Sequence, residues 1–253
     1  MKVEGLAAIV TGGASGLGGA TAAHLAGLGG KVTIFDLDTD KGEAHAAKIG
    51  GRFAKVDVTD EDGVARAVEE AEAANGKARI LVNCAGIAPP RKMVDRDGNP
   101  APLADFARIV NINLIGSYNV LSKFAARIID ADPIGEERGV AISTASVAAY
   151  EGQIGQAGYA ASKAGVVGMT LPIAREMARH GIRVMAIAPG LFLTPMMESF
   201  SPEVQESLGK QAPFPSRLGK PDEYAQLVES IVANPMLNGE TIRLDGAIRM
   251  APK

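Results

Sequence analysis

The order of apolar and polar positions along the 253-residue chain predicts an alternating α/β protein. Short runs rich in β-branched and other apolar residues recur, and Ala-, Glu- and Lys-rich stretches of helical character lie between them. The predicted strands are Leu6–Val10, Lys31–Asp36, Phe53–Asp57, Ile80–Asn83, Val140–Thr144, Arg183–Ala188 and Thr241–Leu244. The predicted helices include Gly16–Leu28, Asp60–Ala74, Phe106–Ile129 and Gln156–Arg179. Because near-continuous apolar strands that alternate with helices form parallel sheets, we expect a doubly wound parallel sheet of about seven strands, with helices on both faces.

Two segments break this alternation. Ala88–Pro102 is polar and rich in proline, and Leu191–Leu218 carries apolar side chains between prolines and polar residues. In a doubly wound sheet, ligands bind beyond the carboxyl ends of the strands, where both segments would lie. We expect residues 191–218 to form a substrate loop, while residues 88–102 are either functional or a plain surface insertion. No long linker or repeat is present, so residues 1–253 are expected to form a single domain.

Composition excludes several classes of function. The net charge of -3, the aromatic share of 4% and the absence of Trp give no footprint of nucleic-acid binding. No apolar stretch approaches the roughly 20 residues that cross a bilayer. Cys84 is the only cysteine and the three histidines are far apart in the sequence, so we expect no metal site. The first predicted strand begins close to residue 1 and leaves no room for a leader, which predicts a soluble, cytoplasmic protein without membrane contacts.

A glycine-rich stretch follows the first predicted strand. It reads TGGASGLGGA, and Gly12, Gly16 and Gly18 give it the pattern T-G-x-x-x-G-x-G. Glycine permits positive φ and a close approach of phosphate oxygens to the backbone, and the N-terminus of the next helix favours a pyrophosphate. The position of this stretch between a strand and a helix of an alternating chain predicts a Rossmann-type dinucleotide site, and not only a tight turn.

Acidic residues follow the second and third predicted strands. Asp36 ends the second strand, where a carboxylate accepts hydrogen bonds from the ribose hydroxyls of an adenosine and repels a 2′-phosphate. Asp38 and Asp40 come next, and no Arg or Lys is expected at that end of the strand, so the predicted cofactor is NAD and not NADP. After the third strand, the Asp57 carboxylate would accept the adenine amino group and the Val58 backbone would bond a ring nitrogen.

Three polar side chains, Ser146, Tyr159 and Lys163, form the candidate catalytic group. A four-residue spacing places Tyr159 and Lys163 on one face of a helix. A nearby ammonium favours the phenolate, so we expect it to lower the tyrosine pKa from its usual value of about 10. Ser146 follows a predicted strand and would hold the substrate oxygen. The group predicts oxidation of an alcohol, with Tyr159 taking the proton while hydride passes to NAD. A serine hydrolase is disfavoured because Ser146 lacks a G-x-S-x-G elbow.

These motifs together resemble the short-chain dehydrogenase/reductase family, and the resemblance covers essentially the whole chain. The matching residues are T-G-x-x-x-G-x-G at Thr11–Gly18, N-C-A-G at Asn83–Gly86, Ser146, and Y-x-x-x-K at Tyr159–Lys163. The usual N-N-A-G of the family is N-C-A-G here. Cys84 is expected to be a small apolar neighbour of the cofactor and not a nucleophile, because no histidine is placed to activate it.

The resemblance implies roles for further residues. The stretch VNINLIGSYNV looks like the family's V-N-L-x-G helix, which places a catalytic asparagine at Asn113, where it would hold a water in the proton relay. The stretch APGLFLTPM is similar to the family's motif after the sixth strand, so Phe192 and Thr194 would bind the nicotinamide end. The expected cofactor contacts are Gly12, Ser15, Gly16, Leu17, Gly18, Asp36, Asp57, Val58, Asn83, Cys84, Ala85, Gly86, Tyr159, Lys163, Pro189, Gly190, Phe192 and Thr194.

Longer stretches, among them APFPSRLGKPDEYA, resemble a subgroup of this family that accepts acyl-CoA, steroid and short branched substrates. We expect a 3-hydroxyacyl-CoA as the preferred substrate, bound by Ser146 and Tyr159. Arg91, Lys92 and Arg96 in the Ala88–Pro102 segment would either meet the CoA phosphates or remain solvated.

Apolar residues of the 191–218 loop are expected to line the acyl site. They are Phe192, Leu193, Met196, Met197 and Phe200. Two other functions remain open: a dehydrogenase of steroids or other secondary alcohols, and a nucleotide-binding scaffold without turnover. The resemblance also implies a homotetramer, for which the apolar C-terminal stretch GAIRMAPK would suit a subunit interface.

Overall fold

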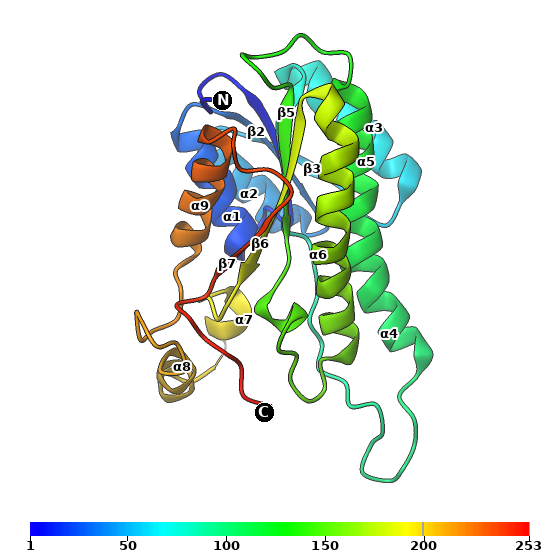
Figure 1. Cartoon of the computed structure of the whole chain (residues 1–253), viewed down its shortest axis with the longest axis vertical. Helices are drawn as coiled ribbons and strands as arrows, with labels where there is room; N and C mark the ends of the chain where they lie inside the picture. Colours follow the sequence, from blue (N-terminus) through cyan, green and yellow to red (C-terminus); the bar gives the residue numbers. More distant parts are fainter. Residues whose placement is uncertain (199, 253) are drawn as a thin grey trace.

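The protein forms one parallel sheet in the residues that the computed structural model describes, which are 1–198 and 200–252, without the Met196 side chain. Its seven strands follow the order β3-β2-β1-β4-β5-β6-β7 (Figure 1). They are β1 (Ala7–Thr11), β2 (Lys31–Asp36), β3 (Arg52–Lys55), β4 (Ala78–Asn83), β5 (Gly139–Thr144), β6 (Ile182–Pro189) and β7 (Thr241–Leu244). Every neighbouring pair is parallel, which confirms the doubly wound fold. The direction of strand order reverses between β1 and β4, the position at which such sheets bind nucleotides.

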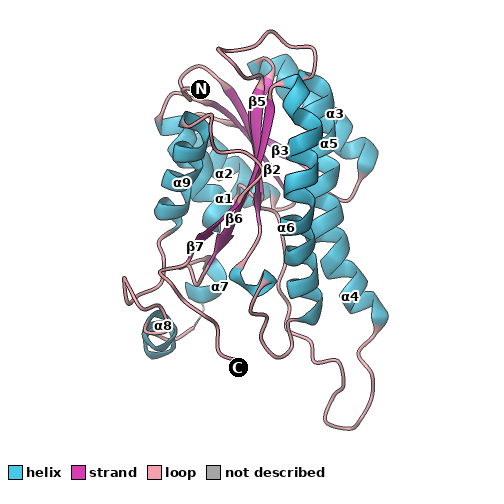
Figure 2. Cartoon of the chain, in the orientation of Figure 1, coloured by secondary structure: helices cyan, strands magenta, loops and turns pink. Residues whose placement is uncertain are grey.

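Helices cover both faces of the sheet (Figure 2). They are α1 (Gly16–Gly27), α2 (Thr39–Ile49), α3 (Glu61–Asn75), α4 (Leu103–Val110), α5 (Gly116–Ile128), α6 (Ala157–Met177), α7 (Pro195–Glu198), α8 (Pro202–Gly209) and α9 (Pro221–Ala233). Alternation along β1 separates two cores: Ala8 and Val10 pack with the layer of α1, α2 and α9, and Ile9 packs with α3 and α5. The central strands are buried on both faces, which explains their continuous apolar runs.

One predicted helix is interrupted. The sequence indicated a continuous helix over Phe106–Ile129, whereas the structure has α4, a π-helical turn at Asn111–Ile115, and then α5. A wide turn of this kind is hard to see in apolar periodicity, because one added residue shifts the pattern by a single position, which is within the scatter of apolar positions along a helix. The chain packs closely just after it, since a Cβ on Gly116 would lie 2.6 Å from Val58 Cγ2.

The two irregular segments lie at the same end of the molecule, beyond the carboxyl ends of the strands (Figure 1). Residues 88–102 are mostly exposed and contain no helix, as the sequence predicted. The 191–218 loop, in contrast, contains the short helices α7 and α8, and α8 begins at Pro202 directly after Ser201. No helix among the described residues is long and apolar enough to cross a membrane.

Candidate active site

The glycine turn between β1 and α1 depends on the absence of side chains at two positions. Gly12 has a φ of +64°, and a Cβ there would lie 2.7 Å from Ala85 N. A Cβ on Gly18 would lie 2.3 Å from Gly12 O, far inside van der Waals contact. The first turn of α1 therefore packs directly on the backbone of the preceding loop, and this contact brings the N-terminus of α1 to the end of the sheet.

The N-terminus of α1 suits an anionic ligand. Ser15, its N-cap residue, is exposed and makes no capping hydrogen bond, and the first turn contains no acidic residue. Helices α2, α3 and α9 differ, because each carries acidic side chains in its first turn. The unused backbone N–H groups and the helix dipole of α1 fit a pyrophosphate, which supports the predicted nucleotide site.

Asp36 holds the glycine turn against the end of β2. Its Oδ2 accepts a hydrogen bond from Ala14 N at 3.0 Å, and its Oδ1 accepts one from Asp38 N at 3.1 Å. Lys41, at the start of α2, is the cation that follows Asp36, Asp38 and Asp40 in the sequence. Its Nζ lies 3.0 Å from Asp38 Oδ2, so its charge is compensated.

The residues at and after the ends of β3 and β4 differ in their exposure: Asp57 is exposed, whereas Val58 and Asn83 are buried. Asp57 Oδ1 accepts bonds from the backbone N–H and the hydroxyl of Thr59, while Val58 is buried. Asn83 is buried and its Nδ2 donates to Ser117 O at 3.2 Å, so its side chain ties β4 to α5. Burial raises the pKa of the Cys84 thiol, which agrees with the expectation that Cys84 is not a nucleophile.

Ser146, Tyr159 and Lys163 meet beyond the end of β5. Ser146 caps a 3₁₀ turn, with its Oγ accepting from Ala148 N at 3.1 Å. Tyr159 and Lys163 lie one turn apart on α6, and the Lys163 Nζ is 5.8 Å from the centre of the Tyr159 ring. The Lys163 ammonium donates to Thr144 O at 2.6 Å and is buried.

The expected direction of the tyrosine pKa shift is wrong for the protein alone. Burial raises the pKa of Tyr159, and only a hydrogen bond with Ser146 opposes this effect. Burial also lowers the pKa of Lys163 to about 8, so its ammonium is costly where it lies. The physical reason is desolvation, which disfavours the charged form of each group and which residue spacing does not reveal.

Asn113 is fully buried in the π-helical turn. Its Nδ2 donates to Ile87 O at 2.9 Å and to Ser162 Oγ at 3.0 Å, and its Oδ1 accepts from Ile87 N at 2.8 Å. The amide therefore clamps the loop after β4 onto α6. A Cβ on Gly86 would lie 3.0 Å from Asn113 Oδ1 and 3.7 Å from Lys163 Nζ, so the backbone at Gly86 runs beside both side chains.

The segment after β6 approaches the glycine turn. A Cβ on Gly16 would meet Pro195 at 3.5 Å and Thr194 at 3.9 Å. Phe192 was expected to line the acyl site, but the residue is only 7% exposed. It belongs to the core beside α9, and its ring covers Gly219. Its ring therefore forms no part of an acyl site. The Met196 side chain, expected in the same lining, lies outside the described part of the chain.

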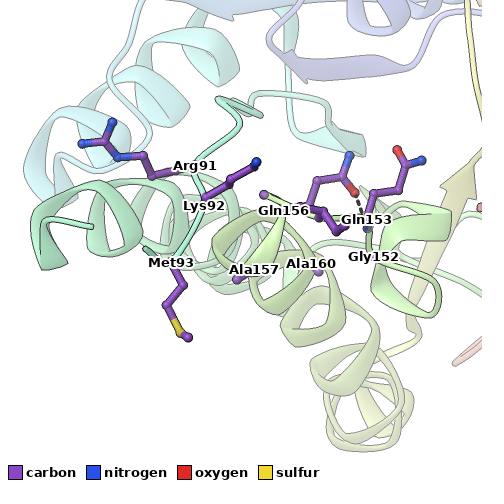
Figure 3. Close-up of a pocket in the computed structure, with 10 residues that line it drawn as sticks. Arg91, Lys92, Met93, Gly152, Gln153, Gln156, Ala157 and Ala160 are labelled. Atoms are coloured by element: carbon purple, nitrogen blue, oxygen red, sulfur yellow. Dashed lines mark hydrogen bonds between the residues drawn. The ribbon is translucent and has the colours of Figure 1, made fainter. Parts of the chain in front are cut away.

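A cavity of about 360 Å³ opens beside the start of α6 (Figure 3). Its lining includes Arg91 and Lys92 from the 88–102 segment and Gln153–Ala157 from the connection into α6. Arg91 Nε lies 3.0 Å from Asp105 Oδ2, so part of its charge is compensated. Arg96 is exposed and does not line this cavity.

Tyr224 is a buried polar residue that the sequence did not single out. Its hydroxyl lies 2.8 Å from Thr144 Oγ1, which in turn donates to Asn83 O at 2.6 Å. Tyr224 therefore supports, from α9, the residue whose carbonyl holds Lys163. A single tyrosine in the apolar pattern of a helix gives no signal of such a contact.

Comparison with known proteins places these observations in one family. The short chain dehydrogenase family model matches residues 6–205. The chain is 53% identical to 3-hydroxyacyl-CoA dehydrogenase type-2 of Homo sapiens, over 99% of this chain and 98% of that protein. It is 49% identical to the protein of that name from Drosophila melanogaster, over 99% of this chain and 100% of that protein.

A solved structure agrees. The crystal structure of 3-hydroxyacyl-CoA dehydrogenase type-2 from Mycobacterium avium matches with a TM-score of 0.95 and 45% identity, over 98% of both chains. The chain belongs to the short-chain dehydrogenase family, and it is an oxidoreductase that uses a nicotinamide cofactor. The resemblance drawn from the motifs is thus confirmed.

The contact between Gly18 and Gly12 gives a test of the turn. Gly18→Ala should lower the free energy of unfolding by about 1–3 kcal/mol, because the added methyl group cannot fit against Gly12 O. It should also weaken NADH binding, measured by fluorescence titration. Gly27→Ala is the matched control in the same helix, since nothing lies within 4 Å of its Cβ. If the two variants have equal stability and affinity, the turn is not constrained in this way.

Proposed function

We propose that the protein is an NAD-dependent 3-hydroxyacyl-CoA dehydrogenase that interconverts 3-hydroxyacyl-CoA and 3-ketoacyl-CoA. The observation that carries the proposal is the 53% identity, over nearly the full length, to a protein named for this activity. The Ser146, Tyr159 and Lys163 group beyond the end of β5 supports the same reaction, and a cavity opens at the start of α6, the helix that carries Tyr159 and Lys163.

The side chains have separate roles in the proposed reaction. The nicotinamide cofactor, when bound, accepts or supplies the hydride. Ser146 Oγ holds the substrate oxygen, and the Tyr159 hydroxyl takes the proton from the alcohol or returns it to the ketone. The Lys163 ammonium has donors free beyond its bond to Thr144 O, and these donors suit the ribose hydroxyls of the cofactor.

Asn113 completes the proton relay in this proposal. Because its amide is already bonded to Ile87 and Ser162, the group left to hold a water is its backbone carbonyl in the π-helical turn. That carbonyl also accepts from Ser117 Oγ at 2.7 Å, and its second lone pair serves the water. The side chain acts as the clamp that keeps this carbonyl and Lys163 in place.

The cofactor site follows from the ends of the first strands. Ser15, Gly16 and Leu17 at the start of α1 cradle the pyrophosphate, and Asp36 binds the adenosine ribose. The remaining proposed contacts are Gly12, Gly18, Asp57, Val58, Asn83, Cys84, Ala85, Gly86, Pro189, Gly190, Phe192 and Thr194. Phe192 contributes through its backbone, since its ring is buried. In this proposal residues 1–253 act as one catalytic domain, with the substrate loop at 191–218.

A homotetramer in the cytoplasm is proposed as the working form. Exposed apolar side chains on one layer of helices support self-association: Leu103, Phe106, Ile115, Tyr118 and Leu171. Ile248 of the C-terminal stretch does not, because it is buried in its own chain. The cytoplasm supplies both NAD and CoA thioesters. Light scattering measures the mass of the assembly, and cell fractionation measures the location.

Cofactor preference tests the role of Asp36. The wild type should prefer NAD over NADP by about 100-fold in kcat/KM, because the carboxylate repels a 2′-phosphate. Asp36→Ala combined with Leu37→Arg should narrow or reverse this ratio. Asp40→Ala serves as a control on the same surface and should leave the ratio unchanged. Equal efficiency of the wild type with both cofactors would rule out the assignment.

Removal of the Tyr159 hydroxyl tests the proton transfer. Tyr159→Phe should lower kcat by about 10²–10⁴-fold, while NADH still binds with nearly normal affinity, because only the reacting oxygen is lost. Stopped assays with excess enzyme measure the residual rate, and fluorescence titration measures NADH binding. Tyr150→Phe, in the 3₁₀ connection after Ser146, is the control and should retain activity. Near-normal activity of Tyr159→Phe would require another acid or base.

The cavity beside α6 supports a CoA thioester as the substrate. Lys92 is exposed at its rim without a salt bridge among the described residues, and Arg91 shares its charge with Asp105. Arg91 and Lys92 at the cavity and Arg96 in the same segment are cations that suit the CoA phosphates.

Replacement of Arg91, Lys92 and Arg96 by alanine should raise KM for acetoacetyl-CoA roughly tenfold and leave KM for a small uncharged ketone unchanged. The control combines Lys48→Ala and Arg66→Ala, exposed cations on α2 and α3. Equal effects on both substrates, or none, would remove this segment from the CoA site. If the wild type reduces simple ketones or steroids but no acyl-CoA, the protein is a dehydrogenase of steroids or other secondary alcohols. If it binds NADH without any turnover, it is a nucleotide-binding scaffold.

A further inference from the structure

The chain after β7 forms a C-terminal strap, defined here as residues Asp245–Pro252. It starts with a turn in which Gly246 and Ala247 have φ values of +59° and +64°. A side chain at positive φ is unfavourable, so the turn must be held by contacts around it. Asp245 Oδ1 accepts from Ala247 N at 3.0 Å, and the turn directs the strap back across the end of the sheet.

A cluster of ion pairs holds the strap to the connection that follows Ser146. Arg243, at the end of β7, forms a bidentate pair with Glu151 at 2.8 and 3.0 Å. Its Nε donates to Asp245 Oδ2 at 2.7 Å, and Arg249 lies 3.4 Å from both acids. The Glu151 and Arg243 side chains are each only 23% exposed, so solvent screens this pair less than a fully exposed one. Hydrogen bonding to Arg243 also holds the pKa of Glu151 below its usual value.

The strap binds directly to residues that line the cavity. Ile154 N donates to Pro252 O at 2.9 Å, and Gln153 Nε2 donates to Ala251 O at 3.0 Å. Gln153 and Ile154 belong to the cavity lining, in the connection that leads into Tyr159 (Figure 3). One wall of the cavity therefore rests on the last described residues of the chain.

The same strap contacts the 191–218 loop. Phe214 N donates to Gly246 O at 3.3 Å, which ties the end of the 191–218 loop to the strap. Ile248 is 1% exposed, and a Cβ on Gly190 would lie 3.3 Å from its Cγ2. The strap thus joins two segments that are distant in sequence and that both lie beyond the carboxyl ends of the strands. Among the described residues, none of its hydrogen bonds reaches the glycine turn or Asp36.

We propose that the C-terminal strap, locked by the Arg243–Glu151 pair, is a positioning element that fixes the substrate-side walls of the site relative to Tyr159. It acts on substrate binding more than on cofactor binding, because its contact with Gly190, a proposed cofactor residue, is a packing contact and not a hydrogen bond. Within the described part of the chain, none of the strap's hydrogen bonds reaches Ser146, Tyr159 or Lys163, and its effect passes through Gln153, Ile154 and Phe214. The inference uses the oxidoreductase reaction of the family, and not the identity of the substrate.

Two variants of the full-length protein loosen the strap in different ways. Glu151→Gln removes the charge from the lock with little change of shape, and deletion of residues 251–253 removes the two carbonyls bonded to Gln153 and Ile154. Each should raise KM for the ketone substrate about five- to tenfold, keep kcat within about twofold, and leave the NADH dissociation constant unchanged. Acetoacetyl-CoA is the probe, and if the wild type does not reduce it, the ketone that it reduces best takes its place. The experiment then distinguishes an error in the proposed substrate from an error in the proposed role of the strap.

Glu61→Gln is the matched control, because Glu61 forms a 2.8 Å pair with Lys123 on the layer of α3 and α5. It should change none of the three quantities. An unchanged KM in both strap variants would overturn the proposal. A parallel loss of NADH affinity, kcat and thermal stability would also overturn it, because that pattern is a general loss of folding. If Glu151→Gln does not fold, the deletion variant decides by the same criteria.

Discussion

Lys163 places an ammonium group inside the protein, where the residue is only 5% exposed and burial lowers its pKa to about 8. A buried ammonium needs oxygen acceptors, and the first of these is the carbonyl of Thr144, at 2.6 Å. The position of that carbonyl is fixed by the end of β5 and by the bonds of the Thr144 hydroxyl to Asn83 O and Tyr224. Three elements, β4, β5 and α9, thus cooperate to hold one charge. A ligand that supplies further oxygens at this place would be stabilised by the same charge.

The glycine turn and the π-helical turn each bring two segments of the chain into close contact. The turn after β1 brings the start of α1 onto bare backbone, because neither Gly12 nor Gly18 has room for a methyl group. The π-helical turn brings Asn113 into the loop after β4, where its amide bonds both Ile87 and Ser162. In both features the backbone departs from regular geometry, and this departure places backbone groups at the site. Such departures are common at functional positions, because regular elements leave few backbone groups unpaired.

Much of the architecture could be predicted, because burial on both faces leaves long apolar runs in β1, β4, β5 and β6. The spacing of Tyr159 and Lys163 likewise identified their common face on α6. Two expectations about the site were wrong, the direction of the Tyr159 pKa shift and the exposure of the Phe192 ring, and both concern properties that depend on distant parts of the chain. Desolvation raises the pKa of Tyr159, and packing against α9 and Gly219 buries Phe192; neither leaves a local pattern in the sequence. Tyr224 escaped notice for the same reason, since its partners lie on other elements.

Two segments beyond the carboxyl ends of the strands, the connection between β5 and α6 and the 191–218 loop, are not joined by the sheet itself. The connection between β5 and α6 carries Glu151, and the 191–218 loop carries Phe214, and each leaves the sheet from a different strand. In a doubly wound sheet, helices and strands fix one another by packing, but loops beyond the carboxyl ends have no such support. The C-terminal strap supplies this support through the ion-pair cluster and through backbone hydrogen bonds to both segments. Over the residues that the structure describes, the hydrogen bonds of the strap share no residue with those that hold the Lys163 ammonium and the glycine turn, so the two sets of supports are separate in the structure.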